Sequence, residues 1–207
     1  MPRKIESLFL AGQAGRLEAL LEEPDQAAAG IALVCHPHPQ HGGTMHNKVV
    51  YRMARGLRRS AHVVLRFNYR GVNLSEGDYA HGEGELDDAR VALDLLMCRY
   101  PALPLTLAGF SFGSRIVLRL GCLGQHRAHR VIAVGFPTVY KDRSFLDGCT
   151  VPRIFIQSTR DQFGPVEELR PLVEALPEPK QLIWIDAQDH FFAGALEQLE
   201  ESVFELA

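Results

Sequence analysis

The sequence lacks the features that mark membrane, exported and nucleic-acid-binding proteins. No charge-free apolar run reaches the length that a transmembrane helix needs, so we expect no membrane partner. The amino terminus begins basic, but Glu6 and Ser7 interrupt an apolar stretch too short for a signal-peptide core, which predicts a cytoplasmic protein. The net charge is -3 and no lysine or arginine cluster has a phosphate-binding pattern, so we expect no nucleic-acid partner.

Cysteine is also scarce. The four residues Cys35, Cys98, Cys122 and Cys149 lie far apart without a C-x-x-C pair, and we expect reduced, mostly buried thiols. Apolar residues make up 46% of the 207 residues and charged residues 23%, as in a soluble globular protein. This length supports one hydrophobic core, which predicts a single domain spanning residues 1–207 and leaves monomer and homodimer both open.

Short apolar runs alternate with longer segments of helical period, a pattern that predicts an α/β fold with a mostly parallel sheet flanked by helices. The sheet has about eight expected strands: Ile5–Leu10, Leu17–Leu21, Ile31–Cys35, Val63–Phe67, Leu105–Ala108, Val131–Val134, Ile154–Gln157 and Leu182–Ile185. The first two contain alternating polar residues and are separated by Gly12 and Gly15, so we expect an antiparallel hairpin at a sheet edge.

Apolar stripes of helical spacing fill the intervals between the expected strands, and each gives a helix one face to cover the sheet. The stripes are Val50, Met53 and Leu57; Leu86, Ala89, Leu93 and Leu96; Val166, Leu169, Val173 and Leu176; and Leu196, Leu199, Val203 and Leu206. Only a short polar segment, Pro137 to Pro152, separates two of the later strands. We therefore expect no large lid domain.

One serine lies between an expected strand and an expected helix, in the segment Gly109-Phe110-Ser111-Phe112-Gly113. A glycine two residues before and two after the serine allows strand and helix to approach, and the sharp turn exposes the hydroxyl at the carboxyl edge of the sheet. The pattern predicts that Ser111 is a catalytic nucleophile. An ordinary tight turn is the alternative.

A serine nucleophile needs a histidine base, which in turn is oriented by a carboxylate. Asp161 and His190 each follow an expected strand, in the chain order Ser, Asp, His that this architecture uses. Asp186 and Asp189 are nearer to His190 in sequence and stay alternatives for the acid, although adjacent side chains such as Asp189 and His190 usually diverge.

The loop after the third expected strand contains two prolines and four histidines. Pro37 and Pro39 have no N–H, so we expect the backbone N–H of His38 to form an oxyanion hole together with that of Phe112. The histidines of this region, His36, His38, His41 and His46, also allow a metal site, but they lack a helical pair and a cysteine, so we expect no metal. We read the acidic run Glu83, Glu85, Asp87, Asp88 as the opening of a helix.

Four segments together resemble the α/β-hydrolase superfamily, and in particular a small lidless bacterial branch near the dienelactone-hydrolase-like enzymes. They are His36 to Lys48 (H-P-H-P-x-x-G-G-T-M-x-N-K), Arg66 to Gly77 (R-F-N-x-R-G-V-x-x-S-x-G), Gly109 to Gly113 (G-F-S-F-G) and His190 to Phe192 (H-F-F). The resemblance implies the α/β-hydrolase fold, a triad of Ser111, Asp161 and His190, and hydrolase chemistry without a cofactor. Asn73 departs from the branch, which commonly has glycine there.

These features lead to the hypothesis of a serine hydrolase that cleaves a small-molecule ester or thioester. Phe110, Phe136, Phe163 and Phe191 fall near strand ends on the expected active edge and are candidates for the wall of a substrate pocket. A catalytically inactive binding protein with the same fold is one alternative. A peptidase, an acyltransferase or a cofactor-free perhydrolase would use the same triad.

Overall fold

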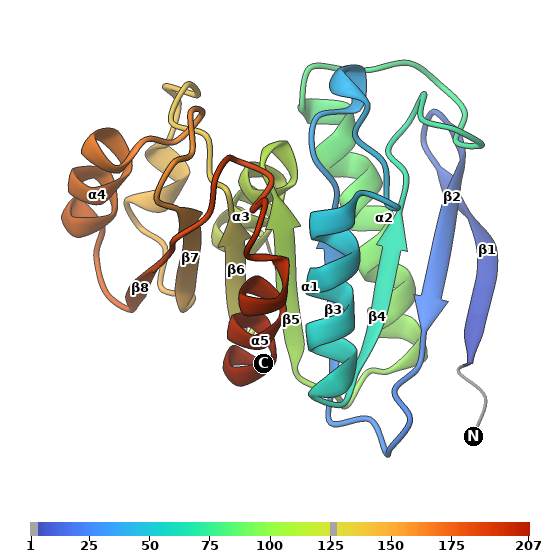
Figure 1. The fold of residues 1–207 in the computed structure, drawn as a ribbon. Helices are drawn as coiled ribbons and strands as arrows, with labels where there is room; N and C mark the ends of the chain where they lie inside the picture. The colour runs from blue at the N-terminus through green and yellow to red at the C-terminus, as the bar shows by residue number, and fades with distance from the viewer. Residues whose placement is uncertain (1–3, 125–127) are drawn as a thin grey trace.

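The computed structural model describes residues 4–124 and 128–207, so the first three residues of the basic amino-terminal stretch lie outside it. The described residues form an eight-stranded sheet in the order β1-β2-β4-β3-β5-β6-β7-β8 (Figure 1). The strands are β1 Ile5–Gly12, β2 Gly15–Glu22, β3 Gly30–Cys35, β4 His62–Phe67, β5 Leu105–Phe110, β6 Arg130–Val134, β7 Arg153–Ser158 and β8 Lys180–Ile185.

The sheet is parallel except at one edge. Strands β1 and β2 pair antiparallel, as do β2 and β4, whereas the five remaining neighbouring pairs are parallel. Strands β3 and β5 are buried along their whole length, which explains why their sequences are nearly continuous apolar runs. The prediction of a mostly parallel sheet of about eight strands, with an antiparallel hairpin at its edge, is confirmed.

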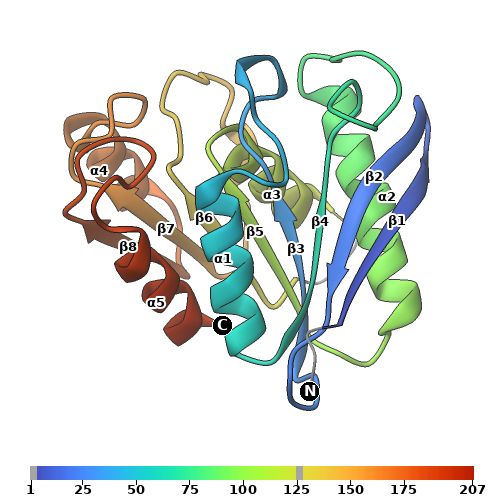
Figure 2. The same cartoon turned by 45° about the vertical axis from the view of Figure 1, so that its right-hand side comes forward.

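Helices cover both faces of the sheet (Figures 1 and 2). In the described part of the chain the α-helices are α1 Lys48–Arg59, α2 Glu83–Arg99, α3 Phe112–Leu123, α4 Val166–Ala175 and α5 Leu196–Leu206. Apolar residues of α2, α3 and α4 belong to one core cluster, and those of α1 and α5 belong to the other. Strand β5 shows the division: Leu105 and Leu107 face the first cluster, and Ala108 and Phe110 the second.

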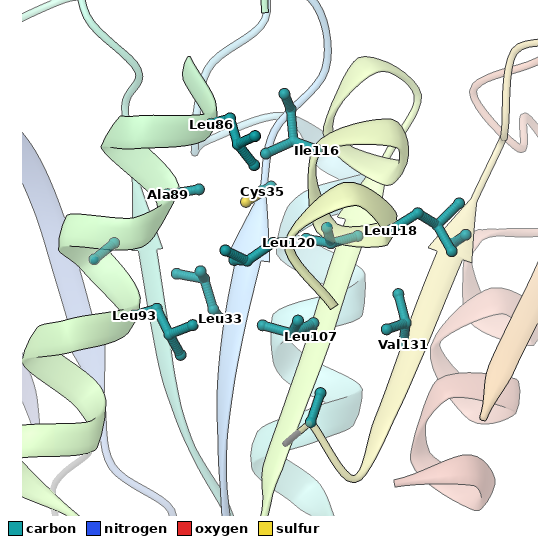
Figure 3. Packing of buried hydrophobic residues seen from close by; sticks show 14 of the residues in the cluster. Leu33, Cys35, Leu86, Ala89, Leu93, Leu107, Ile116, Leu118, Leu120 and Val131 are labelled. Atoms are coloured by element: carbon teal, nitrogen blue, oxygen red, sulfur yellow. The ribbon is translucent and has the colours of Figure 1, made fainter. Parts of the chain in front are cut away.

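Figure 3 shows part of the larger cluster. Leu86, Ala89 and Leu93 of α2 point towards Leu33 of β3, with α3 beside them. These side chains are at most 2% exposed. The expected stripes of α1, α2 and α5 therefore face the sheet, as do Leu169 and Val173 of α4, whereas Val166 belongs to neither cluster and Leu176 lies just after the end of α4.

The acidic run at the start of α2 fixes the loop that precedes this helix. The Glu85 carboxylate accepts hydrogen bonds from the N–H groups of Ala80 at 2.8 Å and Gly82 at 2.6 Å. Asp88 accepts from the Arg70 guanidinium at 2.7 Å and from the Arg70 backbone N–H at 2.9 Å. The loop between β4 and α2 is thus tied to the helix at both of its ends.

The expectation of four reduced thiols is wrong for one pair, because Cys122 and Cys149 form a disulfide. Their sequence separation of 27 hides the contact, which arises where the last turn of α3 meets the segment that enters β7. Cys35 and Cys98 are free, the first buried and the second exposed. A disulfide is typical of oxidising compartments, so the pairing does not favour the cytoplasmic location expected from the sequence.

The segment between β6 and β7 contains one 3₁₀ helix, Ser144–Leu146, which agrees with the expectation that no large lid is present. Within residues 4–124 and 128–207, no helix combines the length and the apolar composition needed to cross a bilayer.

Reduction of the Cys122–Cys149 disulfide should lower the free energy of unfolding by roughly 3 to 4 kcal/mol, because opening the cross-link frees the unfolded chain. Urea unfolding with and without a thiol reductant measures this difference. Cys122→Ser should have the stability of the reduced wild-type protein under both conditions. Cys98→Ser removes an exposed free thiol and should lose as much stability on reduction as the wild-type protein does. A wild-type protein with the same stability under both conditions would contradict the pairing.

Candidate active site

Ser111 lies in a sharp turn between β5, which ends at Phe110, and α3, which begins at Phe112. Its backbone has φ 56° and ψ -119°, a conformation that L-residues with a side chain rarely adopt. A Cβ atom added to Gly109 would lie 2.2 Å from the Gly113 carbonyl oxygen, and one added to Gly113 would lie 2.3 Å from that of Cys35. Both glycines are therefore required by close packing, and the turn presents Ser111 at the carboxyl edge of the sheet.

Asp161 and His190 meet although 29 residues separate them in the chain. Asp161 follows β7 and His190 follows β8, and these neighbouring parallel strands bring the two residues to the same edge. The Asp161 Oδ2 atom lies 2.7 Å from His190 Nδ1. Both side chains are buried, at 2% exposure for each residue.

The Asp161 carboxylate is oriented by three further donors. Its Oδ1 atom accepts from the backbone N–H groups of Phe163 at 2.8 Å and Gly164 at 3.1 Å. Its Oδ2 atom accepts from Gln157 Nε2 at 2.9 Å. A buried carboxylate is stable only when its oxygens are hydrogen-bonded, and here both are.

The two alternative acids make other contacts. Asp186 is exposed and accepts hydrogen bonds from Thr159 and Arg160. Asp189 Oδ1 accepts from the N–H groups of Phe191 at 2.9 Å and Ala193 at 3.0 Å, so this side chain closes the turn that carries His190. Of the three candidates, Asp161 is the one hydrogen-bonded to the imidazole.

Three aromatic rings hold the His190 imidazole. Phe110 lies at a centroid distance of 4.8 Å, Phe163 at 4.8 Å and Phe191 at 5.3 Å. Ser111 and His190 line the same cavity. Within the described residues no hydrogen bond joins the Ser111 hydroxyl to the His190 imidazole.

That cavity has a volume of about 380 Å³ and is lined by the loops that follow β3, β5, β6, β7 and β8. Phe163 and Phe191, two of the predicted pocket residues, line it. The prediction is wrong for Phe110 and Phe136, which are fully buried in opposite core clusters. Phe110 continues the alternation of β5 into the layer beneath α1 and α5, and Phe136 packs edge to face on Phe155.

His38 and Phe112 face each other across the loop after β3, with ring centroids 5.1 Å apart, and both line the cavity. In the described part of the chain, the backbone N–H of neither residue meets a protein acceptor. The His38 carbonyl, in contrast, accepts from the N–H groups of His41 and Gly43 at 3.1 Å each. The cavity therefore has two N–H groups without a protein acceptor, that of His38 in the loop after β3 and that of Phe112 at the start of α3, directly after Ser111.

The His36 side chain has a structural role, because it connects two loops. Its Nδ1 lies 2.7 Å from the Pro37 carbonyl oxygen and its Nε2 accepts from the Tyr69 N–H at 3.1 Å. Burial lowers the pKa of His36 to about 3, against the opposite effect of the bond to Pro37. With both ring nitrogens engaged, His36 joins the loop after β3 to the loop after β4. Among the described residues no three potential ligands lie close enough together to hold a metal ion.

Sequence reasoning missed several residues of this region. Gln157 follows the apolar residues Ile154, Phe155 and Ile156 of β7, is buried, and lies four residues before Asp161; a polar residue that continues a buried strand is a signal that could have marked it. Pro137, Val139 and Tyr140 line the cavity from the segment after β6, for which the sequence indicated only a short polar connection.

Comparison with known proteins gives the same fold. The alpha/beta hydrolase domain family matches residues 32–201. An uncharacterized protein of Rickettsia prowazekii (strain Madrid E) is 35% identical over 205 residues, which cover 95% of this chain and 86% of the relative.

Two solved structures are similar along nearly the whole chain. An α/β serine hydrolase homologue from Coxiella burnetii is 31% identical with a TM-score of 0.91, covering 97% of this chain and 96% of the other. A serine hydrolase without a lid from Xanthomonas campestris is 32% identical with a TM-score of 0.90, covering 99% of this chain and 94% of the other. The chain belongs to the alpha/beta hydrolase family, and its predicted resemblance to the lidless branch is confirmed.

Proposed function

We propose that the protein is a serine hydrolase that cleaves a carboxylic ester or thioester through an acyl-enzyme on Ser111. The observation that carries this proposal is the convergence of a strained serine turn and a buried Asp161–His190 pair on one cavity. The likeness to serine hydrolases supports the same chemistry. This mechanism needs no cofactor, and the cavity of about 380 Å³ supports a small-molecule substrate.

In this mechanism Asp161 accepts a hydrogen bond from the Nδ1–H group of His190, which keeps the proton on Nδ1 and leaves Nε2 free to act as the base. Rotation of the Ser111 side chain brings its hydroxyl to Nε2, which removes the proton as the oxygen attacks the substrate carbonyl. The N–H groups of His38 and Phe112 then stabilise the negative charge on the carbonyl oxygen. His190 returns the proton to the leaving group and afterwards activates the water that releases the acyl group.

The cavity favours an uncharged, apolar substrate group. Among the described residues that line it, none is an aspartate, glutamate, lysine or arginine. Val139, Phe163 and Phe191 are exposed at its wall, and large exposed apolar side chains gathered in one place typically mark a binding surface. A short acyl group or an aryl group fits these surroundings.

The inactive binding protein is the alternative from another class. The buried Asp161–His190 pair favours a catalytic protein, because a buried carboxylate paired with a histidine at a cavity is typical of functional sites and adds little to stability by itself. A peptidase or acyltransferase would use the same residues, and only the substrate distinguishes them.

Replacement of the proposed nucleophile tests the function. A panel of aryl esters, thioesters and lactones should contain substrates that the wild-type protein hydrolyses, and Ser111→Ala should lower their turnover by roughly 10⁴-fold or more, since the acyl-enzyme cannot form. Ser7→Ala, an exposed serine on β1, is the control and should retain full activity. Equal turnover by Ser111→Ala and the wild-type protein would rule the proposal out.

A second pair of variants tests the choice of acid. Asp161→Asn should reduce kcat by about 10⁴-fold, because the amide favours the wrong imidazole tautomer, and should lower the free energy of unfolding by about 1 to 3 kcal/mol, because its amide nitrogen then faces the Gln157 Nε2 donor. Asp189→Asn should leave kcat within a few-fold of wild type, since its Oδ1 still accepts from Phe191 and Ala193. Steady-state kinetics on the best ester measures both, and a larger loss for Asp189→Asn would show that the acid is misassigned.

A further inference from the structure

The side chain of His38 is held more firmly than its backbone role requires. Its Nδ1 accepts from the Gln40 N–H at 3.2 Å, and its Nε2 lies 3.2 Å from the Tyr79 hydroxyl. The ring also packs on His41 at 4.5 Å and on Tyr79 at 5.1 Å between centroids. A residue needed only for its backbone N–H would not require these contacts.

The hydrogen bonds of the His38 imidazole define its tautomer. Burial, and to a smaller extent the neighbouring His41, lower the pKa of His38, so the ring is neutral near pH 7. Because Nδ1 accepts from Gln40, the proton is on Nε2, and this N–H donates to the Tyr79 oxygen. The Tyr79 hydroxyl is thus an acceptor that fixes the direction of the His38 ring.

Tyr79 itself is on a fixed loop. The next residue, Ala80, donates its N–H to the buried carboxylate of Glu85 at 2.8 Å. Arg70, at the other end of the same loop, is bound by Asp88. The backbone on both sides of Tyr79 is therefore bound to α2 through contacts that do not involve His38.

Tyr79 contacts the side chains of both residues whose N–H groups are the expected oxyanion donors. Its hydroxyl contacts the His38 ring, and its own ring lies 6.4 Å from that of Phe112. The His38 carbonyl is already bound by His41 and Gly43, so once the ring is anchored the N–H of His38 is its one main-chain group left to face a ligand.

We propose that Tyr79 is a positioning residue of the oxyanion hole: its hydroxyl oxygen accepts a hydrogen bond from the Nε2–H group of His38 and so holds the His38 backbone N–H beside that of Phe112. This inference rests on the proposed function of Ser111. Tyr79 does not line the cavity, so it acts through His38 and does not touch the substrate. Donors held in place before the reaction stabilise the transition state more than the ground state, so the effect falls on kcat.

Kinetics with p-nitrophenyl acetate as the probe test the inference. Tyr79→Phe keeps the ring and removes the acceptor, and it should lower kcat by about 5- to 10-fold, the effect of one neutral hydrogen bond, with KM within twofold of wild type. His38→Ala keeps the backbone N–H but loses the anchored ring, and kcat should fall by at least the same factor. The double variant should be no slower than His38→Ala, because the Tyr79 hydroxyl then has no ring to hold.

Tyr100→Phe is the matched control. The Tyr100 hydroxyl bonds Glu23 at 3.5 Å from the far end of α2, so its loss should leave kcat unchanged. The inference is overturned if Tyr79→Phe keeps the wild-type kcat, whether or not its KM rises. It is also overturned if the kcat losses of Tyr79→Phe and His38→Ala multiply in the double variant, or if Tyr100→Phe lowers kcat as much as Tyr79→Phe does. A wild-type protein that hydrolyses no ester of the panel would instead overturn the proposed function, which separates the two failures.

Discussion

At Ser111, strand β5, helix α3 and the loop after β3 approach one another so closely that two positions have no room for a side chain. A Cβ atom on Gly109 would meet the Gly113 backbone, and one on Gly113 would meet the Cys35 carbonyl. This contact forces the serine backbone to φ 56°. It also brings the first N–H of α3 beside the loop after β3, so the nucleophile and both expected oxyanion donors result from one packing constraint.

The loops above the sheet stabilise this arrangement through polar contacts between distant segments. His36 joins the loop after β3 to Tyr69, and Asn68 accepts a hydrogen bond from the Met45 N–H at 2.8 Å. Tyr79 extends the same connection to His38. On the other side of Ser111, Gln157 and Asp161 hold His190. A protein without a lid can therefore keep a rigid site, because each loop is bonded to its neighbour and not to a separate cap.

Much of the fold could be predicted because local sequence signals and tertiary packing agree. All eight strands have a period or composition that identifies them, and the two glycines that flank Ser111 are by themselves enough to mark the turn. Asn73, where the related branch commonly has glycine, adopts φ 50°, a left-handed conformation that asparagine tolerates. The strand order also places Asp161 and His190 at one edge, since parallel neighbours end together.

The features that sequence reasoning missed depend on contacts between segments far apart in the chain. The Cys122–Cys149 pair forms because the end of α3 lies beside the segment that enters β7. Phe110 and Phe136 are buried because their side chains, near the ends of β5 and β6, point into the core layers and not into the cavity. Tyr79 has no local pattern that distinguishes it from other loop tyrosines. Its position is visible only when α2 and the loop after β3 are placed in space.

The proposed chemistry requires Ser111 to be the activated nucleophile of this site. Treatment with a fluorophosphonate, followed by mass spectrometry of the intact protein and its peptides, tests it most directly. We expect a single adduct, located on Ser111 and absent from Ser111→Ala. An adduct on another residue, or one that persists in Ser111→Ala, would contradict it.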